Sequence, residues 1–541
     1  MSIKEKKYIL AIDHGTGGPK CAIVSTHGDV VNWAFEPVDL ITGKGGLAEQ
    51  VPDDWWIAIK KASKKVIDDC DIPVEDIVGV CNSSQWSGTV PIDKDGMSLT
   101  NAIIWMDTRA AKYAKEFHKG LLQIDGYNIF KMLTWIKRTS GGPSLNGKDP
   151  ISNITWLQNE KPEIYNKTYK FLEPQDYVNY KLTGKIASSF ATIQMHWVTD
   201  VRDINNIKYS DKLIKKLKIE KEKLPQDLKW STDVLGNVDS EVADELGLEK
   251  ETKVVMGAPD LHSADIGSGA IKNYDGHIYI GTSDWIGCHV PYKKTDIFHN
   301  MASVPSAIPG KYMLINEQEI AGGALTYLRD NILYHKDELL QEEAVPDVYK
   351  IFDKIVAETP AGSNGLIFTP WLVGERAPID DHTIRGGLYN LSLEMNREHI
   401  IRAIFEGVAY NIKWLLIYVE KFIEKWVKKE EPGRIVNGKI MPELNIIGGG
   451  GSSDIWCQIF ADVLDRKIKQ VKNPIQANAR GAAFIAAVGL GYTEWEHIPK
   501  HIEFSKIFTP NPKNRALYEK LFKEYLNIYD AVGDIYERIN E

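Results

Sequence analysis

One short pattern occurs twice in the chain and constrains the fold more than any other feature. Residues 8–25 give an apolar strand, the glycine turn GTGG at 15–18 and a second apolar strand. Residues 276–290 repeat this order around the turn GTSD at 281–284. Glycine accommodates the positive φ angles of tight turns, so each unit predicts a β-hairpin. Two copies of one unit predict an internal duplication.

The segments around these hairpins predict alternating helices and strands. Apolar residues in 53–69 fall broadly on one helical face. Residues 76–85 predict a buried strand, with 87–96 as its antiparallel partner closed by an Asp-Gly turn. Strands followed by helices, with an antiparallel edge, predict a layered α/β sheet. Residues 398–428 keep the 3.6-residue period of a core helix, and 443–464 predict a strand, a glycine turn and a helix.

Length, charge and cysteine content limit the class of protein. A chain of 541 residues is too long for a single core, so we expect two or more domains. Residues from about 110 to 250 are rich in helix signals and lysine and predict a largely helical insertion. The net charge of −9 argues against a nucleic-acid binder. Five cysteines without a CxxC spacing, no signal-peptide core and no membrane-spanning stretch predict a cytoplasmic protein without a membrane partner.

Four glycine turns follow short apolar strands and together favour phosphate binding. They lie at residues 15–18, 281–283, 322–323 and 448–451. Each alone predicts only a hairpin or a helix entry. The backbone N–H groups of several such turns form an anion site if the turns converge. The chain contains neither G-x-x-x-x-G-K-[ST] nor G-x-G-x-x-G after a strand, which excludes the two common nucleotide-binding motifs.

The first of these turns has charged residues at both ends of its hairpin. Asp13 precedes the turn and Lys20 follows it, while Thr16 and the glycine N–H groups suit phosphate oxygens. A carboxylate beside phosphate is favourable only if a cation such as Mg²⁺ bridges the two groups. We therefore predict metal–nucleotide binding with Asp13 at the metal. His14 has no predicted role.

Carboxylate and aromatic residues predict a site for the acceptor of the phosphoryl group. Asp260 ends an apolar strand and precedes small residues, so it suits a base that accepts a proton from an alcohol. A helix N-cap is an equally good interpretation of Asp260, and Asp265 is a weaker competitor for the base. The segments NSSQWSGT and IIWMDTRAA contain groups that would line a sugar pocket, although Trp86 and Trp105 alone would be core residues.

Taken in order, these motifs resemble the FGGY family of carbohydrate kinases, and within it the xylulokinases. The resemblance covers nearly the whole chain and rests on AIDHGTGGPK, AEQVPDDWW, SQWSGTVPIDKDG, AIIWMDTRA, DYVNYKLTG, GAPDLHSADIGSGA, YIGTSDW, FTPWLVGERAP, HIIRAIFEGVAYNI, IIGGGGSSDIWCQIFADVL and RGAAFIAAVGLG. It implies an α/β fold of two actin-like, ribonuclease-H-like domains with ATP and the sugar in the cleft between them. The N-terminal, sugar-binding domain would span residues 1–270, and the C-terminal, nucleotide-binding domain residues 271–541.

The resemblance also implies roles for individual residues. Asp260 matches the catalytic base, and Asp13 matches the carboxylate associated with Mg²⁺. The positions that match the surroundings of ATP are Thr16, Gly17, Lys20, Gly281, Thr282, Gly322, Gly449, Gly450 and Ser453. The positions at the sugar are Gln85, Trp86, Ser87 and Asp260. Glu375 and Arg376 match a motif between the domains, which we interpret as structural.

Two departures from the family fall where the sugar is chosen. Xylulokinases carry Met-His where this chain has Trp86-Ser87, and Leu261 replaces the Asn or Gln that commonly follows the catalytic Asp. We expect an ATP- and Mg²⁺-dependent kinase with D-xylulose as the best single acceptor. Another pentulose, a tetritol or a glycerol-like polyol is the alternative acceptor, and an actin-like nucleotide-dependent binding or chaperone protein is the alternative of another class. The family also suggests a homodimer.

Overall fold

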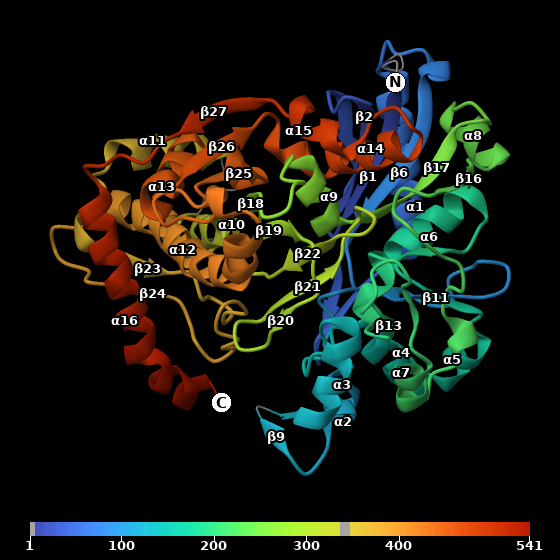
Figure 1. Cartoon of the computed structure of the whole chain (residues 1–541), viewed down its shortest axis with the longest axis horizontal. Coiled ribbons are helices and arrows are strands. Elements are labelled where there is room, and N and C mark those ends of the chain that lie inside the picture. Colours follow the sequence, from blue (N-terminus) through green and yellow to red (C-terminus); the bar gives the residue numbers. More distant parts are fainter. Residues whose placement is uncertain (1–5, 125, 336–346, 541) are drawn as a thin grey trace.

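Two large β-sheets form the centre of the protein, which we describe from a computed structural model for residues 6–124, 126–335 and 347–540 (Figure 1). The strands of the first sheet are β1 (Tyr8–Gly15), β2 (Gly18–Ser25), β3 (Val30–Phe35), β6 (Ile77–Ser84), β16 (Val234–Asn237) and β17 (Lys253–Pro259). Those of the second are β18 (Gly276–Ile280), β19 (Asp284–Val290), β20 (Thr295–Asp296), β21 (Met301–Pro305), β22 (Tyr312–Ile315), β25 (Glu443–Ile447), β26 (Lys467–Val471) and β27 (Phe504–Phe508).

The two sheets share one strand order, which confirms the predicted duplication. The first runs β16-β17-β6-β1-β2-β3, and the second runs β27-β26-β25-β18-β19-β22 before it continues to β21 and β20. In each sheet a hairpin and a third antiparallel strand are followed by two parallel strands and an antiparallel edge strand. The equivalent hairpins, β1–β2 and β18–β19, contain the two repeated glycine turns.

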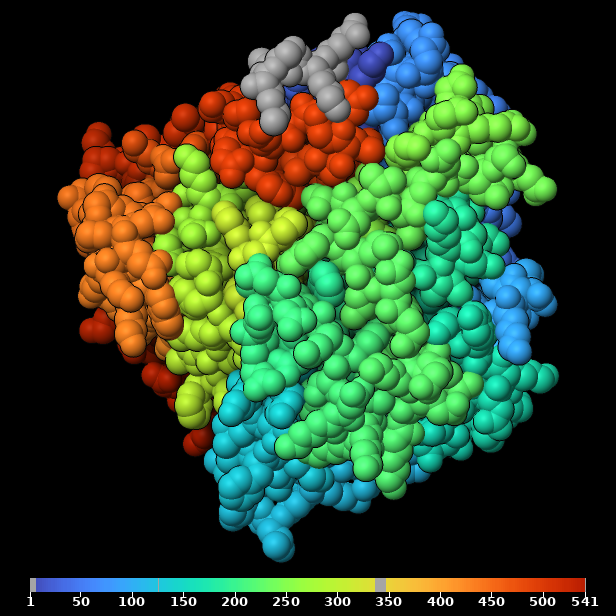
Figure 2. All heavy atoms as spheres, turned by 45° about the vertical axis from the view of Figure 1, so that its right-hand side comes forward, coloured from blue at the N-terminus to red at the C-terminus, as the bar shows by residue number. Residues whose placement is uncertain are grey.

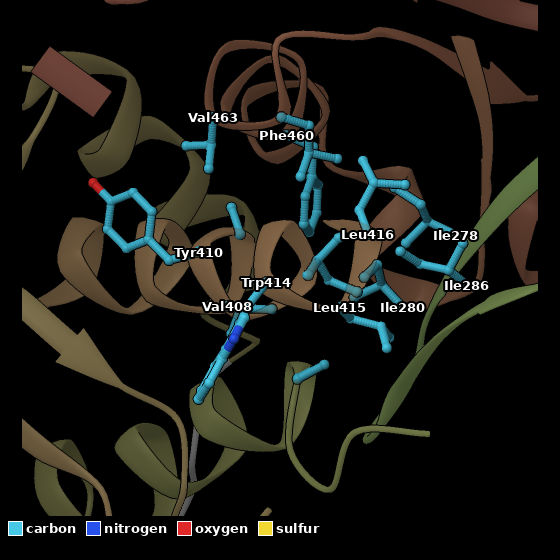
Figure 3. Close-up of a cluster of buried hydrophobic side chains, with 14 of the residues drawn as sticks. Ile278, Ile280, Ile286, Val408, Tyr410, Trp414, Leu415, Leu416, Phe460 and Val463 are labelled. Atoms are coloured by element: carbon cyan, nitrogen blue, oxygen red, sulfur yellow. The ribbon is translucent and has the colours of Figure 1, made fainter. Parts of the chain in front are cut away.

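Helices cover the outer faces of both sheets. α1 (Pro52–Asp68), α6 (Pro174–Thr183) and α8 (Ser240–Leu246) share a core cluster with the first sheet. α12 (Arg397–Glu430) and α13 (Asp454–Leu464) pack on the second. Figure 3 shows Leu415 and Leu416 of α12 and Phe460 of α13 turned toward Ile278 and Ile280 of β18. The predicted amphipathic helices at 53–69 and 398–428 are therefore confirmed.

Two helices lie between the sheets and cross at glycines. α9 (Asp260–Gly267) follows β17 of the first sheet, whereas α14 (Ala477–Gly489) connects β26 and β27 of the second sheet but packs on β1 and β6 of the first. A Cβ on Gly267 would lie 1.8 Å from the Ala477 carbonyl oxygen, and one on Gly481 would lie 1.8 Å from the Ser263 carbonyl oxygen. The absence of side chains at these glycines lets the two backbones touch, so the halves of the molecule are joined through this crossing.

The segment predicted to be a largely helical insertion, residues 110–250, combines helices with short strands. It contains α2 (Ala111–His118), α3 (Ile129–Thr139), α4 (Pro150–Glu160), α5 (Pro162–Lys167), α6, α7 (Asp211–Leu217) and α8, with the short strands β9 (Gln123–Ile124), β10 (Tyr127–Asn128), β11 (Lys170–Leu172), β12 (Ser188–Ser189), β13 (Thr199–Asp200), β14 (Lys208–Tyr209) and β15 (Leu228–Lys229). In Figure 2 the insertion, coloured cyan to green, covers one face of the molecule beside the yellow-green strands that follow it.

One predicted strand pair is wrong. The segment after β6 forms β7 (Val90–Ile92), which pairs antiparallel with β11 and not with β6. The reason is that β6 already has a parallel neighbour on each side, β1 and β17, so no edge of it is open. The Asp-Gly turn nevertheless forms at Asp95-Gly96, where Gly96 has a φ of 79°.

The remaining elements lie around this frame. They are β4 (Ile41–Gly43), β5 (Leu47–Gln50), β8 (Ala102–Ile103), β23 (Ile367–Thr369), β24 (Gly387–Tyr389), α10 (Gly322–Tyr327), α11 (Tyr349–Glu358), α15 (Ile498–His501) and α16 (Arg515–Asn540). In the described part of the chain, no helix is both long enough and apolar enough to cross a membrane. The predicted domain boundary at residue 270 falls between α9 and β18.

Candidate active site

The first glycine turn is a two-residue hairpin loop with an open tip. Gly15 pairs with Gly18, which leaves Thr16 and Gly17 as the loop. Gly18 must be glycine, because its φ is +132° and a Cβ there would lie 2.0 Å from the Glu36 carbonyl oxygen. Gly17 is exposed, and a Cβ on it would meet no atom within 4 Å. Neither backbone strain nor packing requires glycine at position 17, so the space in front of it is free for a ligand.

The second glycine turn is held by the start of α10. The Ala321 N–H donates to the Thr282 carbonyl oxygen at 2.8 Å, and the Gly322 N–H donates to the Gly281 carbonyl oxygen at 2.9 Å. A Cβ on Gly322 would lie 2.5 Å from that Gly281 oxygen. Gly322 is therefore explained by its close contact with the turn. The structure brings together Gly281, Thr282 and Gly322, three of the residues predicted to bind ATP.

The last of the four glycine turns, a short 3₁₀ segment at Gly449–Ser452, packs against the end of β18. A Cβ on Gly450 would lie 2.3 Å from the Ile280 side chain, while Gly449 is exposed and has nothing within 4 Å of its missing Cβ. Ser453 follows as the N-cap of α13 and donates its hydroxyl to Asp353 at 2.7 Å. The packing against Ile280 explains the glycine at position 450, and the capping of α13 explains Ser453. Gly449 is open to a ligand.

Asp13 lies where the two halves of the molecule meet. It is 4% exposed, and its carboxylate lies 3.3 Å from the Lys20 ammonium on the neighbouring strand. It also accepts a hydrogen bond of 3.3 Å from the Asn478 side chain in the first turn of α14. Among the described residues, no three His, Cys, Asp or Glu side chains form a metal site. A single carboxylate suits Mg²⁺, whose other ligands in nucleotide sites are phosphates and water.

Asp260 is the first residue of α9 and has a strongly altered acidity. Pro259, not Asp260, is the N-cap residue, and the Asp260 carboxylate accepts a hydrogen bond from the Leu261 N–H at 2.8 Å. Burial, helped by the nearby Asp13 and Glu317 carboxylates and opposed by the Leu261 hydrogen bond, raises the pKa of Asp260 to about 7. Asp260 therefore shares one electrostatic site with Asp13 of the first half and Glu317 of the second.

The predicted sugar residues Gln85, Trp86 and Ser87 are buried and internally hydrogen-bonded. The Gln85 amide donates to Gln50 at 2.9 Å and accepts from the Thr16 hydroxyl at 3.2 Å. The Trp86 indole donates to the Thr192 carbonyl oxygen at 2.9 Å. The Ser87 hydroxyl donates to the Lys148 carbonyl oxygen at 3.0 Å. The polar groups of these three residues therefore form hydrogen bonds with other residues of the protein.

Thr16 links the first turn to Trp105, since its hydroxyl accepts a hydrogen bond of 2.9 Å from the Trp105 indole. The Lys148 ammonium lies 5.8 Å from the centre of the Trp105 ring. Burial and Arg376 lower the pKa of Lys148, whereas Glu319 and Glu317 oppose this. The helical insertion thus presents a lysine to charged residues of the second half.

The second half contributes a charged network to the same region. Arg376 forms ion pairs with Glu317 and with Glu319, the latter at 2.8 Å. Glu375 is buried and accepts hydrogen bonds from the Glu319 N–H at 3.0 Å and from the Asn411 side chain at 2.6 Å. Burial raises the pKa of Glu375 to about 7. These contacts agree with the interpretation of Glu375 as a structural residue. Arg376 and its partners Glu317 and Glu319 are close enough to Lys148 to affect its pKa.

Sequence reasoning missed Lys148, Glu317 and Asn478 as members of this region. Lys148 and Glu317 lie outside the four glycine turns, and Asn478 lies in the first turn of a helix that belongs to the other half of the chain. His14, for which no role is predicted, is fully buried against the edge of Trp55. Burial lowers the pKa of His14 to about 3, so it is a neutral packing residue behind the first turn.

Known proteins resemble this chain over nearly all of it. The FGGY family of carbohydrate kinases matches through its N-terminal domain at residues 8–267 and its C-terminal domain at 276–490. A xylulose kinase of Bacillus subtilis is 29% identical over 541 residues, covering 98% of both chains. Crystal structures of a gluconate kinase and a ligand-bound xylulose kinase, both from Lactobacillus acidophilus, are each 26% identical with a TM-score of 0.82. They cover 99% and 98% of this chain, respectively, and all of their own.

Proposed function

Because the chain belongs to the FGGY family of carbohydrate kinases, we propose that it transfers the terminal phosphoryl group of ATP to a hydroxyl of a ketose or polyol. D-xylulose is the first acceptor to test, since a xylulose kinase matches nearly the full chain. The observation that carries the proposal is the shared site of Asp260, Asp13 and Glu317 beside glycine turns from both halves. Because the family consists of carbohydrate kinases, we do not propose the alternative of an actin-like nucleotide-dependent binding or chaperone protein.

Asp260 acts as the general base in this proposal. A carboxylate with a pKa of about 7 accepts a proton efficiently near neutral pH. The proton passes from the sugar hydroxyl to Asp260 as the hydroxyl oxygen bonds to the terminal phosphorus of ATP. The bond from that phosphorus to the ADP oxygen breaks, and ADP leaves with the electron pair. Asp265 is no longer a competitor, because it is buried against histidines of the second sheet.

The glycine turns bind ATP in the proposal. Gly17 and Gly449, whose missing Cβ atoms face open space, let phosphate or ribose approach the backbone. Lys20 adds positive charge beside the first turn, and Thr282 belongs to the second. Asp13 would hold Mg²⁺, which when bound neutralises charge on the transferring phosphoryl group. The homodimer and the cytoplasmic location stay predictions.

A panel of acceptors tests this function. Release of ADP from Mg-ATP is measured with D-xylulose, D-ribulose, D-fructose, erythritol and glycerol, and phosphorylated products are identified by mass spectrometry. We expect one compound, D-xylulose first, to raise ADP release well above the rate without acceptor. If none does so, and the ADP-release rate is the same with every compound, the proposed function is wrong.

A sugar acid such as D-gluconate is a second candidate acceptor because of Lys148. Across the described ranges, its ammonium has no ion-pair or hydrogen-bonding partner, and it faces the Trp105 ring. An ammonium partly removed from water gains most from a carboxylate partner. The gluconate kinase of Lactobacillus acidophilus has the same TM-score and identity to this chain as the xylulose kinase.

The variant Lys148→Met separates the two acceptors, because it keeps the length of the side chain and removes the charge. If a carboxylate binds Lys148, kcat/KM for D-gluconate falls roughly 10- to 100-fold, the worth of a charged hydrogen bond. The value for D-xylulose then stays within about threefold. An equal fall for both acceptors, or no turnover of D-gluconate by the wild type, rules out the sugar-acid candidate.

A further inference from the structure

A buried polar cluster lies on the side of α9 that faces the second sheet. Asp265 of α9 is 1% exposed, and its carboxylate oxygens lie 3.0 Å from His277 Nδ1 on β18 and 3.2 Å from His289 Nδ1 on β19. Both histidines are fully buried. Neither contact has the angles of a regular hydrogen bond, so the distances describe close polar contacts.

Asp265 carries a negative charge in this cluster. The nearby His289 and His277 lower the pKa of Asp265 in spite of its burial, so the carboxylate is ionised at neutral pH. Burial lowers the pKa of His289, whose other ring nitrogen lies 2.8 Å from the Ser306 hydroxyl. A buried carboxylate is costly unless polar groups surround it. Hydrophobic residues would fill the interface between α9 and the second sheet without the cost of burying a charge. Packing alone therefore does not explain the polar cluster.

A second contact ties the start of α9 to the same sheet. His262 Nε2 lies 3.0 Å from the Pro305 carbonyl oxygen at the end of β21. The His262 ring also meets the Trp86 ring edge-on, with 5.0 Å between ring centres. His262 and Asp265 therefore fix α9 to three strands of the second sheet at two heights along the helix.

These contacts connect Asp260 to the second glycine turn. Asp260 is the first residue of α9, and α9 has only eight residues. β18, which carries His277, ends at Ile280, immediately before the turn Gly281–Ser283. A shift of α9 along the second sheet would change the distance between the Asp260 carboxylate and this turn.

We propose that Asp265 is a positioning residue: by holding α9 against β18 and β19 through His277 and His289, it fixes the Asp260 carboxylate relative to the second glycine turn. The proposal rests on the proposed function, in which Asp260 is the base. Displacement of a catalytic group by about 1 Å can cost roughly 100-fold in rate. A residue that only stabilises the fold would have no such effect on the rate of the folded enzyme.

The variant Asp265→Asn tests the proposal, because it keeps the size of the side chain and removes the charge. We expect kcat for sugar phosphorylation to fall by about 10-fold or more, with KM for ATP and for the sugar within about twofold of wild type. His277→Gln removes one contact with less damage to the core and should give a smaller fall in kcat. The double variant should lose less than the product of the two single losses, because both act through one contact.

Asp462→Asn is the matched control. Asp462 is a buried carboxylate of α13 that accepts hydrogen bonds from Asn511 and Asn514, away from α9. It should lower the thermal unfolding midpoint and leave kcat unchanged. If Asp265→Asn or His277→Gln behaves in the same way, Asp265 is only a structural anchor and the proposal is wrong. If the wild type phosphorylates no sugar, the proposed function is wrong, and the role of Asp265 falls with it. If the wild type is active and Asp265→Asn keeps its kcat, only the role proposed for Asp265 is wrong.

Discussion

At the scale of single residues, the proposed role of Asp260 as the base makes the rate depend on its acidity. A base must be deprotonated to accept a proton, and the raised pKa of about 7 means that Asp260 gains its proton as the pH falls through neutrality. We therefore predict that kcat/KM for the sugar falls about tenfold for each pH unit below about 7. A profile from pH 5.5 to 8.5 measures this.

Glu375 provides the control for this profile, because burial also raises its pKa to about 7. Glu375→Gln should keep the same acid limb if Asp260 is responsible. Activity that stays constant down to pH 5.5 in the wild type, or an acid limb that vanishes in Glu375→Gln, would contradict the assignment of the limb to Asp260.

Gly449 carries a second prediction at this scale. Its φ is ordinary and a Cβ would touch no protein atom, so Gly449→Ala should leave the thermal unfolding midpoint unchanged. If ATP lies against this glycine, the added methyl group raises KM for ATP by several-fold. Gly433→Ala, at a position with the same open surroundings, should change neither quantity. Equal KM values in both variants would show that ATP does not contact Gly449.

The residues of the site were predictable from the sequence only where a local pattern carries them. Asp13 and Asp260 each stand at the end of an apolar strand beside small residues, and the structure puts both in one electrostatic site. Lys148 has no such pattern, because it lies in the insertion and reaches the site through tertiary packing. The roles of the predicted residues in binding and catalysis stay predictions.

At the scale of elements, the crossing of α9 and α14 depends on glycine at Gly481. In Gly481→Ala, the added methyl group would lie 1.8 Å from the Ser263 carbonyl oxygen. A helix-interior alanine gains up to about 1 kcal/mol over glycine, but overpacking against backbone costs about 1–3 kcal/mol or more. We predict a lower thermal unfolding midpoint for Gly481→Ala.

Gly533→Ala in α16 is the control for the crossing, because a Cβ there meets nothing within 4 Å. Only the gain in helix propensity remains at this position, so its unfolding midpoint should rise slightly. If both variants raise the unfolding midpoint, the crossing of α9 and α14 does not require glycine at position 481, and the prediction is wrong.

The elements themselves differ in how well the sequence predicts them. The helix expected at 398–428 is found at Arg397–Glu430, because its apolar period is a local property of the chain. The strand expected to pair with β6 pairs elsewhere, because the choice of partner depends on the whole sheet. For the same reason, the packing of α14 on the first sheet has no signal in its own residues.

At the scale of the whole molecule, the duplication explains why the proposed site lies between the halves. Equivalent hairpins of two sheets with one strand order carry the two repeated glycine turns. α9 brings Asp260 from the first half toward the second sheet, and α14 brings Asn478 from the second half to Asp13. Parts of both halves are therefore needed to complete one site.

The variant Asp260→Asn tests the central claim, that Asp260 is the base of a sugar kinase. Phosphorylation of the acceptor identified in the panel and the dissociation constant for ATP are measured together. Asp176→Asn is the control, because burial raises the pKa of Asp176 to about 8, so a neutral side chain already stands there at pH 7. We predict that Asp260→Asn loses at least about 100-fold in sugar phosphorylation and binds ATP within about twofold of wild type. Turnover within about tenfold of wild type would contradict the claim.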